Sequence, residues 1–220
     1  MADSGNITSI GILGTGNVAY HLAKAFTAQG INISQFYGRE PGKAREMGQQ
    51  FGAGHTSDLN NLTKADIYFF CLTDDGIIDL KNKIVLKDSF CVHVSGSLEM
   101  NILDAISDKI GVFYPLQTLS RSSKANFSKI PVCIEASNKV LLDQLYKLAS
   151  LISNDVRFLN SSQRILIHIA AVFACNFSNH MFHIAEQILK EHRIDYNILN
   201  PLIEETAQKA IKHKPGKVQT

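Results

Sequence analysis

The chain has 220 residues, of which 45% are hydrophobic and 19% are charged, and its formal net charge is +2. This is the composition of a globular protein, and a charge so close to balance gives no support for binding nucleic acid or an acidic membrane surface. We interpret every apolar run as too short to span a bilayer, and the first residues, MADSGNIT, lack the basic and apolar regions of a signal peptide. The sequence therefore predicts a cytoplasmic protein, and its histidines and cysteines show no spacing typical of a metal site.

The first predicted unit is a strand, a glycine turn and a helix within residues 7–26. Gly14, Gly16 and Ala19 match the G-x-G-x-x-A pattern of dinucleotide-binding turns. The first glycine permits the tight turn, the second lets a pyrophosphate approach the backbone, and the alanine lets the helix pack closely on the strand. The N–H groups at the start of the helix then face the anion. The predicted cofactor contacts in this turn are Gly14, Thr15, Gly16, Asn17 and Val18.

The second strand, residues 31–37, is predicted to end at the adenosine ribose of the cofactor. Sites for NAD place an acidic side chain there, which accepts hydrogen bonds from the 2′-hydroxyl. Gly38 and Arg39 follow the strand here instead. A guanidinium binds a 2′-phosphate through two hydrogen bonds and stacks on adenine, so Arg39 predicts NADP. The alternative is that Arg39 is a solvated loop residue.

Strands predicted at 65–72 and 89–94 end at the same edge of the sheet. Leu72 and Thr73 follow the first of them and are candidate cofactor contacts. Asp74 and Asp75 are interpreted as caps of the next helix rather than as catalysts. The second strand ends in Ser95-Gly96-Ser97, whose hydroxyl and N–H groups either position a substrate or form a plain turn.

The remaining elements complete a predicted dinucleotide-binding domain over residues 1–159. Further strands are expected at 110–114, 130–135 and 156–159, and helices at 41–51 and 138–152. Residues 119–129 are polar and are expected to form a mobile loop. The fold class is therefore α/β: a Rossmann-type, mostly parallel sheet with helices on both faces.

The predicted second domain, residues 160–220, is smaller and all-helical. A helix expected at 161–192 contains no Pro or Gly, and its centre is apolar nearly all round, so it is expected to be buried between other elements or in a subunit interface. A spacing of 3.6 residues per turn gathers polar side chains into one stripe, made of Arg164, His168, Asn176, Asn179 and His183. The stripe consists of satisfied core and interface groups, or it faces the cleft above the nicotinamide. A second helix is predicted at 202–211.

Several segments carry a resemblance to a known family. GILGTGNVA is similar to the turn of pyrroline-5-carboxylate reductases and of deazaflavin-coenzyme–NADP oxidoreductases. Together with HVSGS at 93–97, YPLQT at 114–118 and RILIHIAAVFACNF at 164–177, it resembles a bacterial group of NADP oxidoreductases that join a Rossmann-like domain to an uncharacterised helical domain. GVFYP at 111–115 is also similar to the G-x-H-P segment of prephenate dehydrogenases, with Tyr114 in place of the histidine.

The resemblance implies NADP as cofactor and a homodimer formed through the C-terminal helices. It carries over the cofactor contacts Gly14, Gly16, Asn17 and Arg39, and it supplies no catalytic residue, because the group has no established substrate. Members of the group usually continue beyond residue 220, so this chain is expected to be a shortened form.

Two functions follow as hypotheses. The first is an NADP-dependent oxidoreductase that exchanges a hydride with a small C=O or C=N substrate. His168 is then the general acid, because imidazole titrates near neutral pH, while Asn176 hydrogen-bonds the substrate and Ser95 positions it. The second is a non-catalytic NADP-binding sensor or scaffold, which the lack of an evident catalytic Lys, Tyr or Ser–His pair favours. Binding of nucleic acid is disfavoured by the charge.

Overall fold

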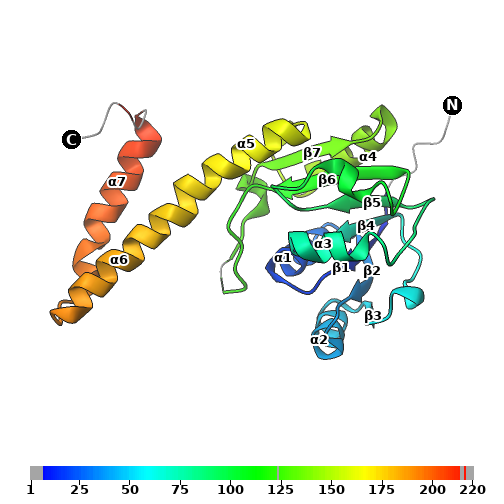
Figure 1. Ribbon diagram of the computed structural model, residues 1–220, viewed down its shortest axis with the longest axis horizontal. Helices are drawn as coiled ribbons and strands as arrows, with labels where there is room; N and C mark the ends of the chain where they lie inside the picture. Colours follow the sequence, from blue (N-terminus) through cyan, green and yellow to red (C-terminus); the bar gives the residue numbers. More distant parts are fainter. Residues whose placement is uncertain (1–6, 123, 214–215, 217–220) are drawn as a thin grey trace. The chain divides into compact units, whose positions relative to one another are not determined.

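The computed structural model describes residues 7–122, 124–213 and 216 (Figure 1). The chain divides into two compact units, Met1–Ala170 and Ala171–Thr220. Residues 1–6 lie outside the described residues. The same holds for residues 217–220, which the expectation of a shortened chain concerns.

The first unit is built on one eight-stranded sheet with the order β3-β2-β1-β4-β5-β6-β7-β8. The strands are β1 (Ser9–Leu13), β2 (Asn32–Tyr37), β3 (Gly54–Thr56), β4 (Ile67–Phe70), β5 (Phe90–His93), β6 (Lys109–Pro115), β7 (Val132–Ala136) and β8 (Val156–Phe158). The pair β6–β7 is antiparallel, and the other pairs of the sheet are parallel. The order from β3 to β6 is that of dinucleotide-binding folds, and it reverses between β1 and β4. The predicted fold class is confirmed.

Helices cover both faces of this sheet, as the sequence predicts. They are α1 (Asn17–Thr27), α2 (Pro41–Phe51), α3 (Asp74–Leu80) and α4 (Lys139–Ser150), with 3₁₀ turns η1 (Leu59–Asn61), η2 (Met100–Leu103) and η3 (Phe127–Lys129). Local chemistry sets their ends. Pro41 opens α2, and Gly52 ends it with a left-handed φ of 64°. Asn138 caps α4 by accepting a hydrogen bond from the Leu141 N–H.

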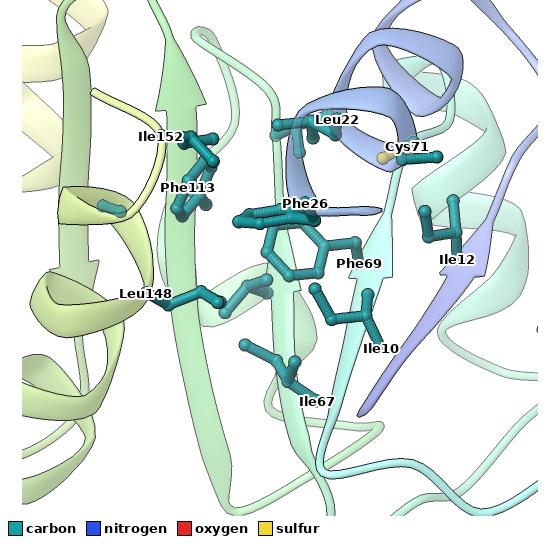
Figure 2. Packing of buried hydrophobic residues seen from close by; sticks show 14 of the residues in the cluster. Ile10, Ile12, Leu22, Phe26, Ile67, Phe69, Cys71, Phe113, Leu148 and Ile152 are labelled. Atoms are coloured by element: carbon teal, nitrogen blue, oxygen red, sulfur yellow. The ribbon is translucent and has the colours of Figure 1, made fainter. Parts of the chain in front are cut away.

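The larger part of the core lies between the sheet and helices α1, α2 and α4. Figure 2 shows Phe26 of α1 among side chains of the central strands, and its ring centroid lies 5.6 Å from that of Phe69 and 5.8 Å from that of Phe113. On the opposite face, Ile77 of α3 belongs to a second cluster that includes Phe70 of β4. Burial on both faces explains why the central strands read as continuous apolar runs.

The second unit continues from the helix α5 (Ser161–Ala171), most of which belongs to the first unit. It contains a π-helical segment η4 (Val172–Phe177), α6 (Ser178–Glu191), a 3₁₀ turn η5 (Tyr196–Leu199) and α7 (Asn200–Lys212). The boundary between the units therefore lies further along the chain than the predicted boundary after residue 159. The polar stripe was predicted from a uniform spacing of 3.6 residues per turn, and the π-helical segment breaks that spacing.

The helix from Ser161 to Glu191 also corrects an expectation about membranes. Its 31 residues are long and apolar enough, by length and composition alone, to cross a bilayer. The prediction that every apolar run is too short was therefore wrong. Within the described part of the second unit, no residue is buried. The centre of this helix was expected to be buried, and this chain alone does not bury it.

Candidate active site

The glycine turn lies where β1, β2 and β4 come together. The Gly14 N–H donates to the Tyr37 carbonyl at 2.8 Å, and Gly14 has a φ of 130°. A Cβ at Gly14 would lie 2.1 Å from the Cys71 carbonyl oxygen, so only glycine fits. Gly16 precedes α1, and a Cβ there would meet no heavy atom within 4 Å. The helix start is thus open on this side, with no side-chain cap, which suits a pyrophosphate.

A pocket beside this turn joins two of the predicted cofactor contacts. Arg39, at the end of β2, and Leu72, after β4, line the same pocket. The other lining residues are Tyr37, Leu59, Gly76, Asp79, Leu80 and Lys83. Gly38 brings the end of β2 against the glycine turn, because a Cβ there would lie 2.8 Å from Cγ2 of Thr15. The pocket combines apolar side chains with the charged Arg39, Lys83 and Asp79, and its two cations fit an adenosine 2′-phosphate.

Thr73 caps α3 and its role as a cofactor contact stays a prediction, while Asp74 does not cap the helix. The side chain of Thr73, and not an aspartate, caps α3 by accepting from the Gly76 N–H at 3.2 Å. Asp74 lies in the first turn of α3 and reaches across to the end of β5, so its prediction as a cap was wrong. Its carboxylate accepts hydrogen bonds from the hydroxyls of Ser95, at 2.8 Å, and Ser97. Asp74 thereby joins the carboxyl ends of β4 and β5.

Ser95 is largely committed to this turn. Its hydroxyl donates to Asp74 and accepts from the N–H groups of Ser97 and Leu98, each at 3.1 Å. The Ser95 N–H donates to Nδ1 of His93, whose ring is buried below the turn. Burial, with a contribution from the positive charge of Arg164, lowers the pKa of His93 to about 3. The role of Ser95 toward a substrate stays a prediction.

Gly96 is the point at which Tyr114 and His168 meet the end of β5. The Tyr114 hydroxyl lies 3.1 Å from Nδ1 of His168, and the two ring centroids are 6.0 Å apart, with the ring planes at 73°. A Cβ at Gly96 would lie 2.5 Å from that Nδ1 and 2.8 Å from Cζ of Tyr114. The sequence identified His168 and the Ser-Gly-Ser turn separately, and the structure brings them together. Tyr114 was missed as a site residue, although its YPLQT segment follows a predicted strand.

A buried arginine holds α5, and with it His168, against the sheet. Arg164 is 1% exposed and donates to Oε2 of Glu135 at 2.6 Å and to the Leu98 carbonyl. Ser161 also donates to Glu135 at 2.8 Å and accepts from the Met100 N–H at 3.0 Å. Arg164 precedes His168 by one helical turn, so these bonds set the position of the imidazole. They also explain why the start of α5 belongs to the first unit.

The polar segment expected to be a mobile loop packs on the glycine turn. The Leu119 carbonyl accepts from Nδ2 of Asn17 at 3.1 Å, and the Ser120 carbonyl lies 2.8 Å from Nε2 of His21. Arg121 donates to the Thr15 carbonyl at 2.9 Å and lies 5.4 Å from the centroid of the Tyr20 ring. Sequence reasoning missed this contact, because nothing local pairs residues so far apart in the chain.

The other predicted site residues fall as follows. Val18 lies in the first turn of α1, beside Asn17. Asn176 is exposed within the π-helical segment of the second unit, so its role toward a substrate stays a prediction. The structure therefore gathers Gly14, Gly16 and Arg39 at one part of the sheet edge and Ser95 and His168 at another.

Comparison with known proteins decides the family. Residues 9–95 match the family described as NADP oxidoreductase, coenzyme F420-dependent, and residues 130–220 match a domain of unknown function, DUF2520. A crystal structure from Bacteroides fragilis, provisionally named an NADP oxidoreductase, is 38% identical, with a TM-score of 0.91 over 97% of this chain and 84% of that one. This chain belongs to the NADP oxidoreductase family. The predicted family is thus confirmed, and no curated protein matches the chain.

More distant structures share the fold of this chain. A reductive aminase from Aspergillus terreus, in complex with NADPH and ethyl-5-oxohexanoate, is 12% identical, with a TM-score of 0.70 over 93% of this chain and 75% of that one. A pyrroline-5-carboxylate reductase from Coxiella burnetii is 13% identical, with a TM-score of 0.63 over 95% of this chain and 82% of that one. The family description and the Bacteroides fragilis structure name an NADP oxidoreductase, and the reductive aminase is in complex with NADPH.

Proposed function

We propose that this NADP oxidoreductase is a cytoplasmic reductase that binds NADPH and reduces a small C=O or C=N substrate. The open glycine turn at the strand-order reversal carries the proposal, since Gly14 permits the tight turn and Gly16 leaves the helix start open for a pyrophosphate. Arg39 would bind the 2′-phosphate and Leu72 the adenine. NADPH supplies the hydride when bound. A C=N substrate is supported by two structural neighbours, a reductive aminase and a pyrroline-5-carboxylate reductase.

The residues at the end of β5 would serve the substrate. His168 would protonate the oxygen or nitrogen that receives no hydride, as general acid. The Ser95-Gly96-Ser97 turn, held by Asp74, would present its backbone to the substrate. If His168→Gln reduced the substrate at the wild-type rate, the assignment of His168 would fail.

Cofactor selection gives the first test. Binding of NADPH and NADH is measured by calorimetry for the wild type, Arg39→Ala and the control Arg45→Ala, which removes an exposed arginine from α2. We expect Arg39→Ala to weaken NADPH binding about 10- to 100-fold, the equivalent of a charge-assisted hydrogen bond, and to leave NADH binding unchanged. Equal losses for both cofactors would contradict the role of Arg39.

Turnover gives the second test. NADPH oxidation is followed with a cyclic imine, 1-pyrroline, and a cyclic ketone, cyclohexanone, as probes of the two substrate classes. Oxidation with either supports the reductase. Tight NADPH binding without oxidation across a wider panel of imines and carbonyl compounds would instead support the sensor or scaffold.

A further inference from the structure

Tyr114 and His168 form a hydrogen-bonded pair at the carboxyl ends of β5 and β6. Their separation is 3.1 Å between the phenol oxygen and Nδ1, and both residues belong to the first compact unit. The contact is held from three sides. Gly96 leaves room for both rings, β6 carries Tyr114, and the Arg164–Glu135 ion pair fixes the helical turn before His168.

We propose that Tyr114 and His168 act as a proton relay in which Tyr114 selects the tautomer of His168 and replaces the proton it gives away. The inference rests on the proposed reductase function. Tyr114 acts through His168, so it is a positioning residue, and His168 is the group that would meet the substrate.

The chemistry follows from the bond between the two side chains. A protonated phenol can donate to Nδ1 of a neutral imidazole or accept from an Nδ1–H group, and the relay requires that Tyr114 donates. Nδ1 is then the acceptor, and Nε2 carries the ring proton. A neutral imidazole is by itself a weak acid, so a second donor at Nδ1 makes proton release from Nε2 easier.

The relay balances as follows. NADPH, when bound, would supply a hydride to the carbon of the C=O or C=N bond, and the proton on Nε2 of His168 would move to the oxygen or nitrogen. Nδ1 takes the proton of the Tyr114 hydroxyl, which leaves a phenolate and a neutral imidazole with its proton on Nδ1. A proton from water then restores the pair.

Asp74 and Arg164, which bond to the turn at Gly96 and to the start of α5, have partners of their own. Asp74 accepts from Ser95 and Ser97 on either side of Gly96, and Arg164 is paired with Glu135. The buried His93 lies under the turn as the acceptor for the Ser95 N–H. The Tyr114 hydroxyl is the group that lies at Nδ1 of His168, and in the proposed relay it is the proton donor.

Tyr114→Phe removes the hydroxyl and keeps the ring that packs on Gly96. We expect NADPH oxidation with 1-pyrroline or cyclohexanone to fall about 10- to 100-fold at neutral pH, because the relay then lacks the proton that Tyr114 supplies to His168. The matched control is Tyr68→Phe, which removes a hydroxyl that donates to the Thr63 carbonyl at 2.8 Å, away from the pair.

Nitrogen NMR of His168 provides a readout that needs no turnover. We expect the Nε2–H tautomer in the wild type and in Tyr68→Phe, and a larger share of Nδ1–H in Tyr114→Phe. Failure of wild-type turnover with every probe would overturn the reductase, and the relay with it. Wild-type turnover with an unchanged rate in Tyr114→Phe would overturn the relay alone. An Nδ1–H tautomer in the wild type would also overturn the relay, whatever the activity.

Discussion

Gly96 shows how one missing side chain determines the geometry of the site. The imidazole of His168 and the ring of Tyr114 both occupy space that any Cβ at position 96 would need. The backbone of the β5 end can therefore lie directly against the imidazole. At the residue scale, the site depends as much on this close approach as on the polar groups themselves.

We predict that Gly96→Ala separates His168 from Tyr114. Overpacking of this kind costs about 1–3 kcal/mol of unfolding free energy, and a displacement of about 1 Å in a catalytic group costs up to about 100-fold in rate. Urea unfolding and NADPH oxidation measure the two effects. Gly30→Ala is the control, because its φ of 78° strains an alanine by about 1 kcal/mol while its Cβ would meet no neighbour. A similar loss of activity in both variants would contradict the prediction.

His93 predicts a pH dependence of stability. Its folded pKa of about 3 lies below the value of about 6.5 for a free imidazole, so between these values the unfolded chain binds a proton that the folded chain does not. The free energy of unfolding therefore has its full value, as far as His93 is concerned, above pH 6.5. It falls as the pH drops toward 3, by up to about 1.4 kcal/mol per pH unit.

Urea unfolding at pH 7 and pH 5 measures this loss. In His93→Asn an amide oxygen can replace Nδ1 as acceptor for the Ser95 N–H, and no group titrates. We expect the free energy of unfolding to depend less steeply on pH in this variant. Equal slopes for the two proteins would show that His93 does not carry the effect.

At the scale of elements, segments far apart in the chain hold the cofactor turn. The segment 119–121 follows β6, yet its backbone and Arg121 bond to the start of α1 and to the Thr15 carbonyl. Arg121 also lies 3.4 Å from Oε1 of Glu46 on α2. This segment therefore connects the glycine turn with two helices on one face of the sheet.

Arg121→Ala tests this connection. Loss of the bond to Thr15 and of the contact with Tyr20 should weaken the local structure by about 1–2 kcal/mol, equivalent to about 5- to 30-fold faster amide hydrogen exchange in segment 119–122. Lys124→Ala changes an exposed cation in the same polar stretch and should leave the exchange rate unchanged. Unchanged exchange in Arg121→Ala would mean that backbone bonds alone hold the segment.

At the scale of the whole molecule, the second unit leaves many apolar side chains uncovered. Those from the described residues 171–213 include Phe173, Phe177, Met181, Ile188, Ile198 and Leu202. A groove between α6 and α7 is lined by Phe182, Ala185, Leu199, Leu202, Ile203 and Thr206. Exposed apolar surface of this extent is typical of subunit interfaces. We therefore retain the proposal that the C-terminal helices form a homodimer.

Sedimentation equilibrium tests the homodimer. We expect a mass of twice 24.3 kDa for the wild type. Leu202→Asp places a charge in the groove between α6 and α7 and should shift the mass toward that of one chain. Gln208→Asp adds the same charge at an exposed position on α7 and should remain dimeric. A wild-type mass of 24.3 kDa at high protein concentration would contradict the proposal.

Local patterns in the amino-acid sequence were sufficient to predict the sheet, its helices and the glycine turn before α1. Apolar runs, glycine spacing and helix caps act over a few residues, so β1 with α1, β2 and α2 could be read directly. Arg39 was identifiable for the same reason, because it directly follows a predicted strand.

Which side chains meet at the other end of the site depends on the three-dimensional fold. No local pattern connects the residues that meet there. Examples are the Tyr114–His168 pair, the bonds of Asp74 to the end of β5 and the packing of Arg121 on Thr15. The antiparallel β7 and the π-helical segment within 161–191 likewise depend on long-range packing. Such contacts arise when the chain brings distant segments to one sheet edge, and a pattern with a period of a few residues carries no record of them.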